Sequence, residues 1–438
     1  MPPPSLSQEN GHDIAPTERP SPAETVPPYV HVAPLTMADR RTSTSEEPEG
    51  EIVNELPVFR FTGGWNVEAW VYQGVSLTVE DVYGNIVVQD EHAEWKKHGN
   101  TTLRVAKNSY RFKLSEDVDL FGLGEEHNFI LLANDFDRTM IRNSLALALA
   151  DDLGLAYSSR SQFAEVYVDG VYKGCFLLVE PVQAGSERVD INEAQHEYLL
   201  EINPRDFFQF YTPIYEYSLV VKAPEKPADY ELQWLSDFFT EAETAIDSGN
   251  RESIEQYLDL DSFLDSYLIY ELFKNLDTNR FSTYFYIQDG KLFSGPVWDF
   301  DLSAGNVEVD KTAEGWIVED GWWFTLMSNE WFQTLFAERL AMRQPEIIRL
   351  YRDTEEQKNR IDEIVASASG AFGRNYGIWD LKTRSYNIEI FPFPSYEENV
   401  EYLRQWLSDR NCWMLSELAP ENSEELIRDA RLEGGRDA

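Results

Sequence analysis

Residues 271–306 read ELFKNLDTNRFSTYFYIQDGKLFSGPVWDFDLSAGN and hold three aspartates, Asp277, Asp299 and Asp301, on either side of a short alternating segment. In the residues around the start of this stretch, Asp261–Lys274, apolar side chains recur at three- and four-residue steps, which predicts an amphipathic helix. Asp277 follows shortly after the end of this helix. The first of the three carboxylates is therefore expected just past a helix terminus.

A hairpin is predicted between the first and second aspartates. Thr283–Ile287 and Lys291–Pro296 are rich in aromatic and β-branched residues, and Gln-Asp-Gly lies between them, as in two strands joined by a tight turn. The hairpin would return Asp299 to the side of Asp277. Two carboxylates so placed suit phosphoryl transfer, because one can orient an acceptor hydroxyl and the other can hold Mg²⁺ against phosphates. Capping a turn is the alternative role for either aspartate taken alone.

Two further elements are predicted upstream. Tyr110–Leu114 alternates like a strand and carries Lys113 where a strand lysine would meet phosphate oxygens. Asp137–Leu153 is rich in Ala and Leu, which predicts a helix, and Gly154 is a usual C-terminal stop.

A second hairpin is predicted at Phe163–Val168 and Tyr172–Val179, around Asp-Gly. The chain leaves it through an apolar run that ends in Glu180 and a proline, as a connection between two lobes would. The predicted parts follow the order of those in a protein kinase. That order is a strand with a lysine, a helix, two strands, a connection, a helical region, an aspartate, a hairpin and a second aspartate.

With these pieces in place, the chain resembles the spore-coat CotH kinase family, which has an atypical, secretory-type protein-kinase-like fold. The matching pieces are His98–Thr102, Tyr110–Leu114, Leu131–Asp135 with Ile141–Asn143, Ser158–Val179, Arg188–Ile191, Tyr198–Ile202, Val221–Glu225, Leu258–Phe263 and Gly295–Asn306. The resemblance implies an α+β fold with two lobes. A small lobe of mixed antiparallel sheet is expected at about residues 52–183, and a mainly helical large lobe at about residues 184–419.

The resemblance also implies roles for individual residues. Asp277 is similar to the catalytic-loop acid, Asp299 to the acid that holds the metal, and Lys113 to the catalytic lysine that binds phosphate. Asp301 and Asn279 are expected to complete the metal shell. Further nucleotide contacts are expected from Arg111, Glu180 and Arg142. For Arg142 the alternative is an ion pair with Asp135 or Asp137, and for Glu180 it is a local cap.

The implied activity is that of a protein Ser/Thr kinase that depends on ATP and on Mg²⁺ or Mn²⁺. Lys113, Asp277 and Asp299 are all present, which favours this hypothesis. One alternative is a non-catalytic binding module of a cell surface or spore coat on the same fold. Another is a phosphotransferase that acts on a small molecule or a glycan.

The charge of the chain limits its partners. It has 78 Asp and Glu against 37 Lys and Arg, a net charge of −41. Such a charge repels phosphates at long range, which argues against nucleic acid and against anionic membranes. It is compatible with a basic, Ser-rich protein substrate, although adaptation of the protein to strong salt is the favoured explanation. Nothing in the sequence indicates an oligomeric state.

The two ends differ from the middle. Met1–Glu51 is rich in Pro, Ser, Thr and Glu, which predicts a disordered tail. Residues 420–438 are predicted to be a charged, frayed end. Neither a secretory signal nor an apolar run of membrane-spanning length is visible, which predicts a cytoplasmic location by default, with the spore coat or secretion as alternatives.

The remaining segments are assigned more coarsely. Leu56–Val88 is expected to form extra strands before the small lobe, and Val307–Leu418 to be helical, with a closing helix at Glu397–Leu418. Four tryptophans of this region, Trp316, Trp322, Trp323 and Trp331, are expected in the core rather than in a substrate groove. Two cysteines give no disulfide or zinc framework, and Cys175 and Cys412 are both expected to be core residues.

Overall fold

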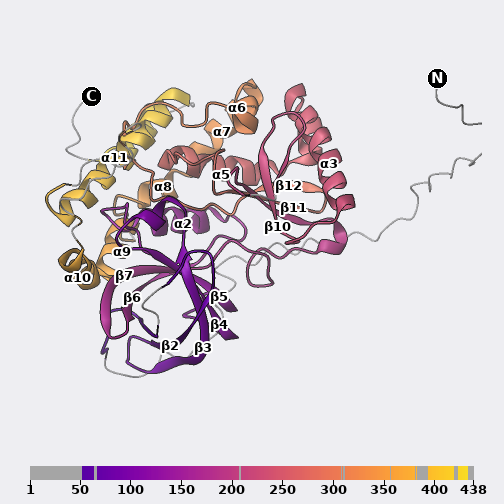
Figure 1. The fold of residues 1–438 in the computed structure, drawn as a ribbon. Helices are drawn as coiled ribbons and strands as arrows, with labels where there is room; N and C mark the ends of the chain where they lie inside the picture. Colours follow the sequence, from indigo (N-terminus) through magenta and orange to yellow (C-terminus); the bar gives the residue numbers. More distant parts are fainter. Residues whose placement is uncertain are drawn as a thin grey trace, which may run out of the picture.

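The structure is a computed structural model that describes residues 52–63, 67–206, 209–306, 308, 311–355, 357–379, 381, 393–418 and 423–432. The predicted tail Met1–Glu51 lies outside the described residues. The described part combines two β-sheets with many helices, so the expected α+β class is confirmed. In Figure 1 a barrel of strands lies below, and the helices and the second sheet lie above it.

Seven strands close into a barrel in the order β1-β2-β3-β4-β5-β7-β6. They are β1 (Val58–Thr62), β2 (Gln73–Glu80), β3 (Ile86–His98), β4 (Ser109–Asp119), β5 (Glu125–Leu132), β6 (Ser161–Val168) and β7 (Val171–Val179). All neighbouring pairs are antiparallel except β1 and β6, which run parallel and close the barrel. The strands expected as an addition in Leu56–Val88 are therefore integral to the barrel.

Alternating side chains fill the barrel. Successive residues of a strand point to opposite faces, and the inward set is aromatic and aliphatic. The rings of Phe61 and Trp95 stack with centroids 4.5 Å apart, and Phe112 lies edge-on to Phe61 at 5.8 Å. All three side chains are buried. The barrel thus has a packed core of its own, separate from the larger core above it.

A second, five-stranded sheet has the order β12-β11-β8-β10-β9. Its strands are β8 (Tyr198–Ile202), β9 (Gln209–Tyr211), β10 (Ser218–Ala223), β11 (Thr283–Gln288) and β12 (Lys291–Ser294). The hairpin predicted after Asp277 is confirmed as β11 and β12. Its first strand pairs with β8, which comes some eighty residues earlier in the chain.

Most helices lie on the side of the molecule that holds the second sheet, whereas α10 packs against β7 of the barrel (Figure 1). Short 3-10 turns lie at Thr101–Arg104 and Glu193–Gln195. The helices are α2 (Arg142–Leu153), α3 (Asp229–Ser248), α4 (Arg251–Tyr257), α5 (Leu260–Phe273), α6 (Gly321–Met327), α7 (Glu330–Met342), α8 (Gln344–Arg349), α9 (Arg360–Ser367), α10 (Ser369–Ile378), α11 (Tyr396–Leu418) and α12 (Ser423–Ala430). Helix α11 confirms the predicted closing helix.

Helix α5 confirms the helix predicted before Asp277 but not its amphipathic character. The carboxylate of Asp259 caps it by accepting a hydrogen bond from the N–H of Ser262 at 2.8 Å. Every residue from Phe263 to Phe273 is buried, because α2, α7, α11 and β12 all pack against this helix. A helix that is buried on all sides holds the loop of Asp277 firmly in place.

Two predicted boundaries were wrong. The helix expected from Asp137 begins at Arg142, because the carboxylate of Asp137 accepts hydrogen bonds from the N–H groups of Thr139 and Arg142 and fixes a turn before the helix. The end expected to fray contains α12, whose Ala430 is buried and accepts a hydrogen bond from the hydroxyl of Tyr351 at 2.8 Å.

The core predictions hold in part. Trp322 and Trp323 are fully buried, whereas Trp316 and Trp331 are partly buried against the core. Cys175 is buried and Cys412 partly buried, and both thiols are free.

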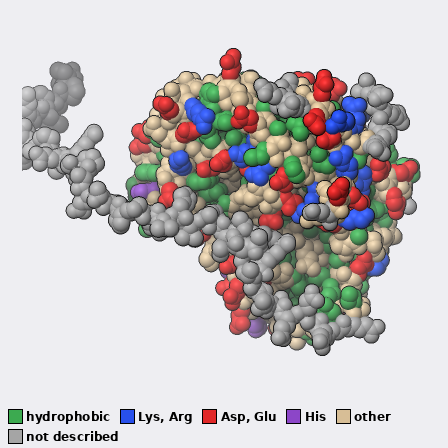
Figure 2. Space-filling model, turned by 180° about the vertical axis from the view of Figure 1, so that it is seen from behind, with side chains coloured by type: hydrophobic (Ala, Val, Ile, Leu, Met, Phe, Trp, Pro, Cys, Tyr) green, Lys and Arg blue, Asp and Glu red, His purple; other side chains and the backbone are tan. Residues whose placement is uncertain are grey.

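The surface carries the excess of acidic residues. Figure 2 shows Asp and Glu side chains spread over the visible face, with Lys and Arg in smaller groups among them. Within the ranges described, no helix is both long enough and apolar enough to cross a membrane.

Candidate active site

A cavity lies where the barrel meets the second sheet, and Asp277, Asp299 and Asp301 line it. Asp277 follows α5, while Asp299 and Asp301 follow β12. The barrel contributes residues from the ends of β3, β4 and β5 and from the turns beyond them: His98–Thr102, Lys107, Ser109 and Leu132–Phe136. The second sheet contributes Glu201 and Tyr284. The structure therefore brings together the three aspartates that the sequence singled out.

One amide fixes the two main aspartates relative to each other. The side-chain oxygen of Asn275 accepts a hydrogen bond from the N–H of Asp277 at 3.1 Å, and its side-chain nitrogen donates to the carbonyl of Asp299 at 3.0 Å. Asn275 is buried, so water does not compete for these bonds. The sequence did not single out Asn275, although a polar side chain just past a helix end is a signal for such a role.

Three residues that line the cavity have left-handed backbones without being glycine. Their φ angles are 50° at Asn134, 51° at Ser282 and 66° at Asp299. Such conformations cost about 1 kcal/mol or more each and tend to occur at functional sites. At Asp299 the turn directs the carboxylate toward Ser282, whose hydroxyl donates a hydrogen bond to it at 3.2 Å.

The charges at the cavity are poorly compensated. Burial, followed by the charge of Asp277, raises the pKa of Asp299 to about 7, while the hydrogen bond from Ser282 opposes the rise. Burial also raises the pKa of Asp277, against the charges of Arg205 and Arg280. Two partly buried carboxylates that repel each other form a site that gains free energy when a cation binds.

The oxygen donors fit a hard divalent cation, although they do not form a complete cage. Among the residues described, the only three ligands with atoms within 4.8 Å of one another are Asp117, Glu126 and His127, at the exposed edge of the barrel. Mg²⁺ usually binds one or two carboxylates together with water and substrate phosphates. Asp299, with Asp301 lining the same cavity, matches that incomplete shell.

Helix α2 anchors the loop that carries Asp299. The side-chain oxygen of Asn143 accepts a hydrogen bond from the N–H of Phe300 at 2.7 Å, and its nitrogen donates to Asn134 at 3.1 Å. Arg142 donates to the carbonyls of Ser303 and Ala304, at 3.0 and 3.2 Å.

For Arg142 the sequence left open two roles, a nucleotide contact or an ion pair with Asp135 or Asp137. Its guanidinium also pairs with the carboxylate of Asp137 at 2.5 Å, and both side chains are buried. The alternative of an ion pair with Asp137 is therefore the one observed.

The turn His98–Thr102 forms another wall. Gly99 has a φ of 103°, and a Cβ there would lie 1.9 Å from the hydroxyl oxygen of Thr102, so only glycine fits. Burial and the nearby charges of Arg111, Lys96 and Lys222 lower the pKa of His98 to about 3. His98 is thus neutral at physiological pH and stands beside a group of cations.

Two predicted nucleotide contacts, Arg111 and Lys113, form a group of cations with Lys96. Arg111 lies opposite Lys96 in the β3–β4 ladder, and the ammonium groups of Lys96 and Lys113 lie 4.7 and 4.6 Å from the ring centroid of Tyr72. Arg111 donates to the side-chain oxygens of Asn128 and Gln183. Lys113 and Arg111 do not line the aspartate cavity, although the charge of Arg111 acts on His98, which does line it. The sequence did not single out Lys96 and Tyr72.

Two other expected contacts lie elsewhere. Glu180 does not line the cavity and accepts hydrogen bonds from Arg160 and Arg188, both at 2.7 Å, so the local role is the one observed. Asn279 does not line the cavity, and its amide donates to the carbonyl of Asp320 at 3.1 Å.

Two lysines do reach the cavity region. Lys107 is buried in the wall and donates to the carbonyl oxygens of Ala133 and Cys175. Lys222 pairs at 2.9 Å with the carboxylate of Glu201, which lines the cavity and contributes to the raised pKa of Asp299.

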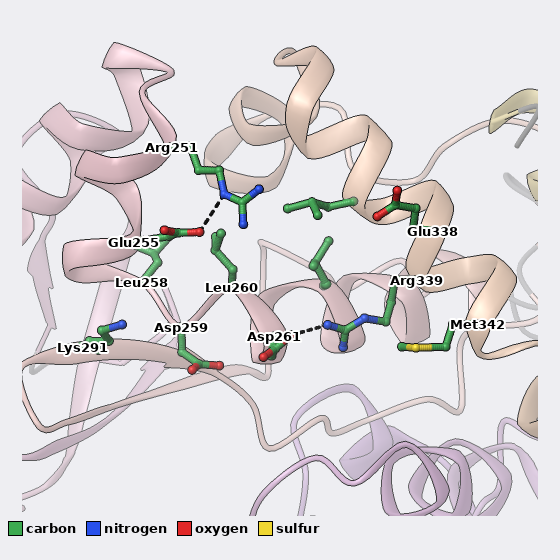
Figure 3. Close-up of a pocket in the computed structure, with 12 residues that line it drawn as sticks. Arg251, Glu255, Leu258, Asp259, Leu260, Asp261, Lys291, Glu338, Arg339 and Met342 are labelled. Carbon is green, nitrogen blue, oxygen red and sulfur yellow. Dashed lines mark hydrogen bonds and ion pairs between the residues drawn. The ribbon is translucent and has the colours of Figure 1, made fainter.

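A separate groove opens between α4, the start of α5 and α7 (Figure 3). Four of its charged side chains form ion pairs within the groove: Arg251 with Glu255 at 2.7 Å, and Arg339 with Asp261. Its remaining lining is apolar or solvated, and none of the three aspartates reaches it. The aspartate cavity is therefore the candidate active site.

Comparison with known families agrees with this geometry. The model of the family described as "CotH kinase protein" matches residues 96–414, which is most of the chain. This chain belongs to the CotH kinase family. The match contains the cavity residues from His98 to Asp301, and it begins within β3, so β1 and β2 of the barrel lie before it. A search of curated proteins finds no match.

Proposed function

We propose that this CotH family member is a protein Ser/Thr kinase that transfers the γ-phosphate of ATP and depends on Mg²⁺ or Mn²⁺. The observation that carries the proposal is the placement of Asp277 and Asp299 in one cavity, tied together by Asn275. Family membership points to phosphotransfer in general. The reaction needs one acid that holds the metal and another that orients the acceptor hydroxyl, and the two carboxylates can take these roles.

Asp299 is the proposed metal-holding acid. Its side chain is oriented by Ser282 and its backbone by Asn275, and burial together with the charge of Asp277 raises its pKa, which a bound cation would counter. Asp301 is the proposed second carboxylate of this shell. A bound divalent metal neutralises charge on the phosphates. Asn279, which the sequence also suggested, is turned toward Asp320 in the structure.

Asp277 is the proposed acid that orients the acceptor hydroxyl and accepts its proton. The charges of Arg205 and Arg280 oppose the rise of its pKa, which favours the ionised form of the carboxylate. An ionised carboxylate within hydrogen-bonding reach of the hydroxyl is what proton acceptance requires.

The nucleotide phosphates are proposed to lie between Asp299 and the cation group of the barrel. Within the part of the chain that the structure describes, Arg111, Lys113 and Lys96 form no ion pair with a carboxylate, although the chain has twice as many acids as bases. Phosphate oxygens would satisfy these cations. The barrel and the helical part would then act as the two lobes of a kinase-like fold, with the nucleotide between them.

The nature of the phosphorylated product tests this proposal. Purified protein is incubated with Mn²⁺ and ATP labelled at the γ-phosphate, together with Ser- and Thr-containing peptides or with a panel of sugars. Phosphoserine or phosphothreonine in the products supports the protein kinase. Label on sugars alone would favour the glycan phosphotransferase, and ATP binding with no product would favour a binding module.

A further inference from the structure

Two arginines stand at the acceptor side of the cavity. Arg205, from the loop after β8, lines the cavity, and Arg280 follows Asp277 by three residues. Both are exposed. Their charges act on the pKa of Asp277, whereas the groups that act on Asp299 are all acids or a hydroxyl. Of the two acids, Asp277 is thus the one whose pKa these arginines lower.

Arg205 is held in place before any ligand binds. Its guanidinium carbon lies 3.9 Å from the ring centroid of Phe281, which also lines the cavity. The loop itself is fixed by a hydrogen bond from the N–H of Arg205 to the side-chain oxygen of Asn203 at 3.2 Å. A guanidinium stacked on an aromatic ring keeps its N–H groups free at the edges and loses less rotamer entropy on binding.

Neither arginine has an acidic partner in the described parts of the chain. The chain has 78 acids for 37 bases, and most arginines in the described ranges, such as Arg142, Arg339 and Arg410, form ion pairs. Arg205 and Arg280 interact with Asp277 only through the field of their charges, without an ion pair. Donors that remain unpaired at the mouth of a cavity are available to an anion.

We propose that Arg205, assisted by Arg280, binds an anionic group of the acceptor that lies close to the hydroxyl to be phosphorylated. This inference rests on the proposed function and names its substrate class. The planar fork of an arginine binds a carboxylate or a phosphate through two parallel hydrogen bonds, so the anion is either an acidic residue or a phosphorylated one. The acceptor is therefore acidic near its hydroxyl, unlike the basic acceptor that the net charge of −41 suggests.

The test uses the full chain and four Ser peptides that differ only beside the serine, where they carry Glu, phosphoserine, Gln or Lys. Peptide binding without ATP and transfer of labelled phosphate with Mn²⁺ are measured for each. For the wild type we expect kcat/KM at least tenfold higher with the Glu or phosphoserine peptide than with the Gln peptide, and lowest with the Lys peptide. The two anionic peptides show which source of the anion is preferred.

Variants assign the effect to Arg205. Arg205→Gln should remove most of the preference by raising KM with little change in kcat, Arg205→Lys should keep part of it, and Arg205→Glu should make the Lys peptide the best acceptor. Arg280→Gln should have a smaller effect in the same direction. Arg251→Gln, which changes an arginine of the groove in Figure 3, is the matched control and should leave the preference unchanged.

The two ideas fail in different ways. Labelling of all four peptides with equal efficiency, unaffected by Arg205→Gln, would overturn the acceptor inference and leave the kinase standing. Tight binding of the anionic peptides that is lost in Arg205→Gln, without transfer to any peptide, would support the anion site and overturn the proposed kinase activity. A higher KM for ATP in Arg205→Gln, with the peptide preference unchanged, would place the arginine on the nucleotide instead.

Discussion

Asn275 donates a hydrogen bond from its side-chain amide to the backbone carbonyl of Asp299 at 3.0 Å. The same amide accepts from the N–H of Asp277, so a single buried side chain sets the separation of the two acids on which the proposed reaction depends. Helix α5, buried from Phe263 to Phe273, holds Asn275 through a hydrogen bond from its N–H to the carbonyl of Tyr270 at 3.0 Å. The geometry of the site thus follows from the core of the helical part.

Replacing Asn275 should therefore reduce turnover without abolishing ATP binding. Asn275→Ala removes both hydrogen bonds, and misplacement of catalytic groups by about 1 Å costs roughly a hundredfold in rate. We expect kcat to fall by about that factor while the affinity for ATP changes little. Steady-state kinetics would show this, with Asn85→Ala on an exposed turn as control. A variant with normal kcat would show that the two loops keep their spacing without Asn275.

Asp299 should make the stability of the metal-free protein depend on pH in one direction. Its pKa is raised to about 7 from 3.8, so between these values the folded protein holds a proton that the unfolded chain has released. The free energy of unfolding therefore falls as pH rises through this window. Asp299→Asn should be more stable than wild type at pH 8, by up to about 4 kcal/mol, and the difference should vanish below about pH 4.

Urea unfolding at pH 4 and pH 8, in the presence of a chelator, measures this difference. Asp289→Asn, at the exposed turn of the β11–β12 hairpin, is the control and should show no such dependence. If Asp299→Asn were less stable than wild type at pH 8, the carboxylate would have to be stabilised by the fold.

Removing Lys113 should weaken ATP binding. The lysine shares the ring of Tyr72 with Lys96 and stands beside Arg111, where the proposal places phosphates. Lys113→Met should raise KM for ATP about tenfold, the effect of losing one charged hydrogen bond. Lys291→Met, in the groove of Figure 3, is the control. Unchanged kinetics in Lys113→Met would transfer the phosphate-binding role to Lys107, which lines the cavity.

The buried pair of Glu271 and Arg410 should dominate the stability of the helical part. Its nitrogen–oxygen distance is 2.9 Å, both side chains are fully buried, and Glu271 also accepts from the N–H groups of Ile317 and Val318. Arg410→Met leaves the carboxylate without its cation and should cost about 3–5 kcal/mol. Adding Glu271→Gln to Arg410→Met should recover part of this loss in thermal unfolding. A further loss in the double variant would contradict the account.

Local patterns predicted the elements near the site well. Helix α5 and the β11–β12 hairpin were expected within about a residue at most ends, because a helix cap, an apolar period and an Asp-Gly turn are signals contained within a few residues. The convergence of Asp277 and Asp299 follows from that hairpin.

Long-range pairings could not be read from the sequence. The parallel contact of β1 with β6 closes the barrel over about a hundred residues, and no local signal marks it. The burial of Glu271 within α5 depends on its ion pair with Arg410, which lies about 140 residues later in the chain. The sequence also could not predict whether Lys113 lines the aspartate cavity. The alternation of a strand shows on which face of the sheet a side chain lies, but not which cavity that face adjoins.

The central claim is tested most directly by phosphate transfer and ATP binding in wild type, Asp299→Ala and Asp277→Ala, with Mg²⁺ or Mn²⁺, at low and high salt. We predict that the wild type alone transfers label, that Asp299→Ala loses metal-dependent ATP binding, and that Asp277→Ala binds ATP nearly as the wild type does. Equal loss of ATP affinity in both variants would contradict the assigned roles. Absence of transfer by folded wild type at every salt concentration, with every acceptor, would contradict the kinase itself.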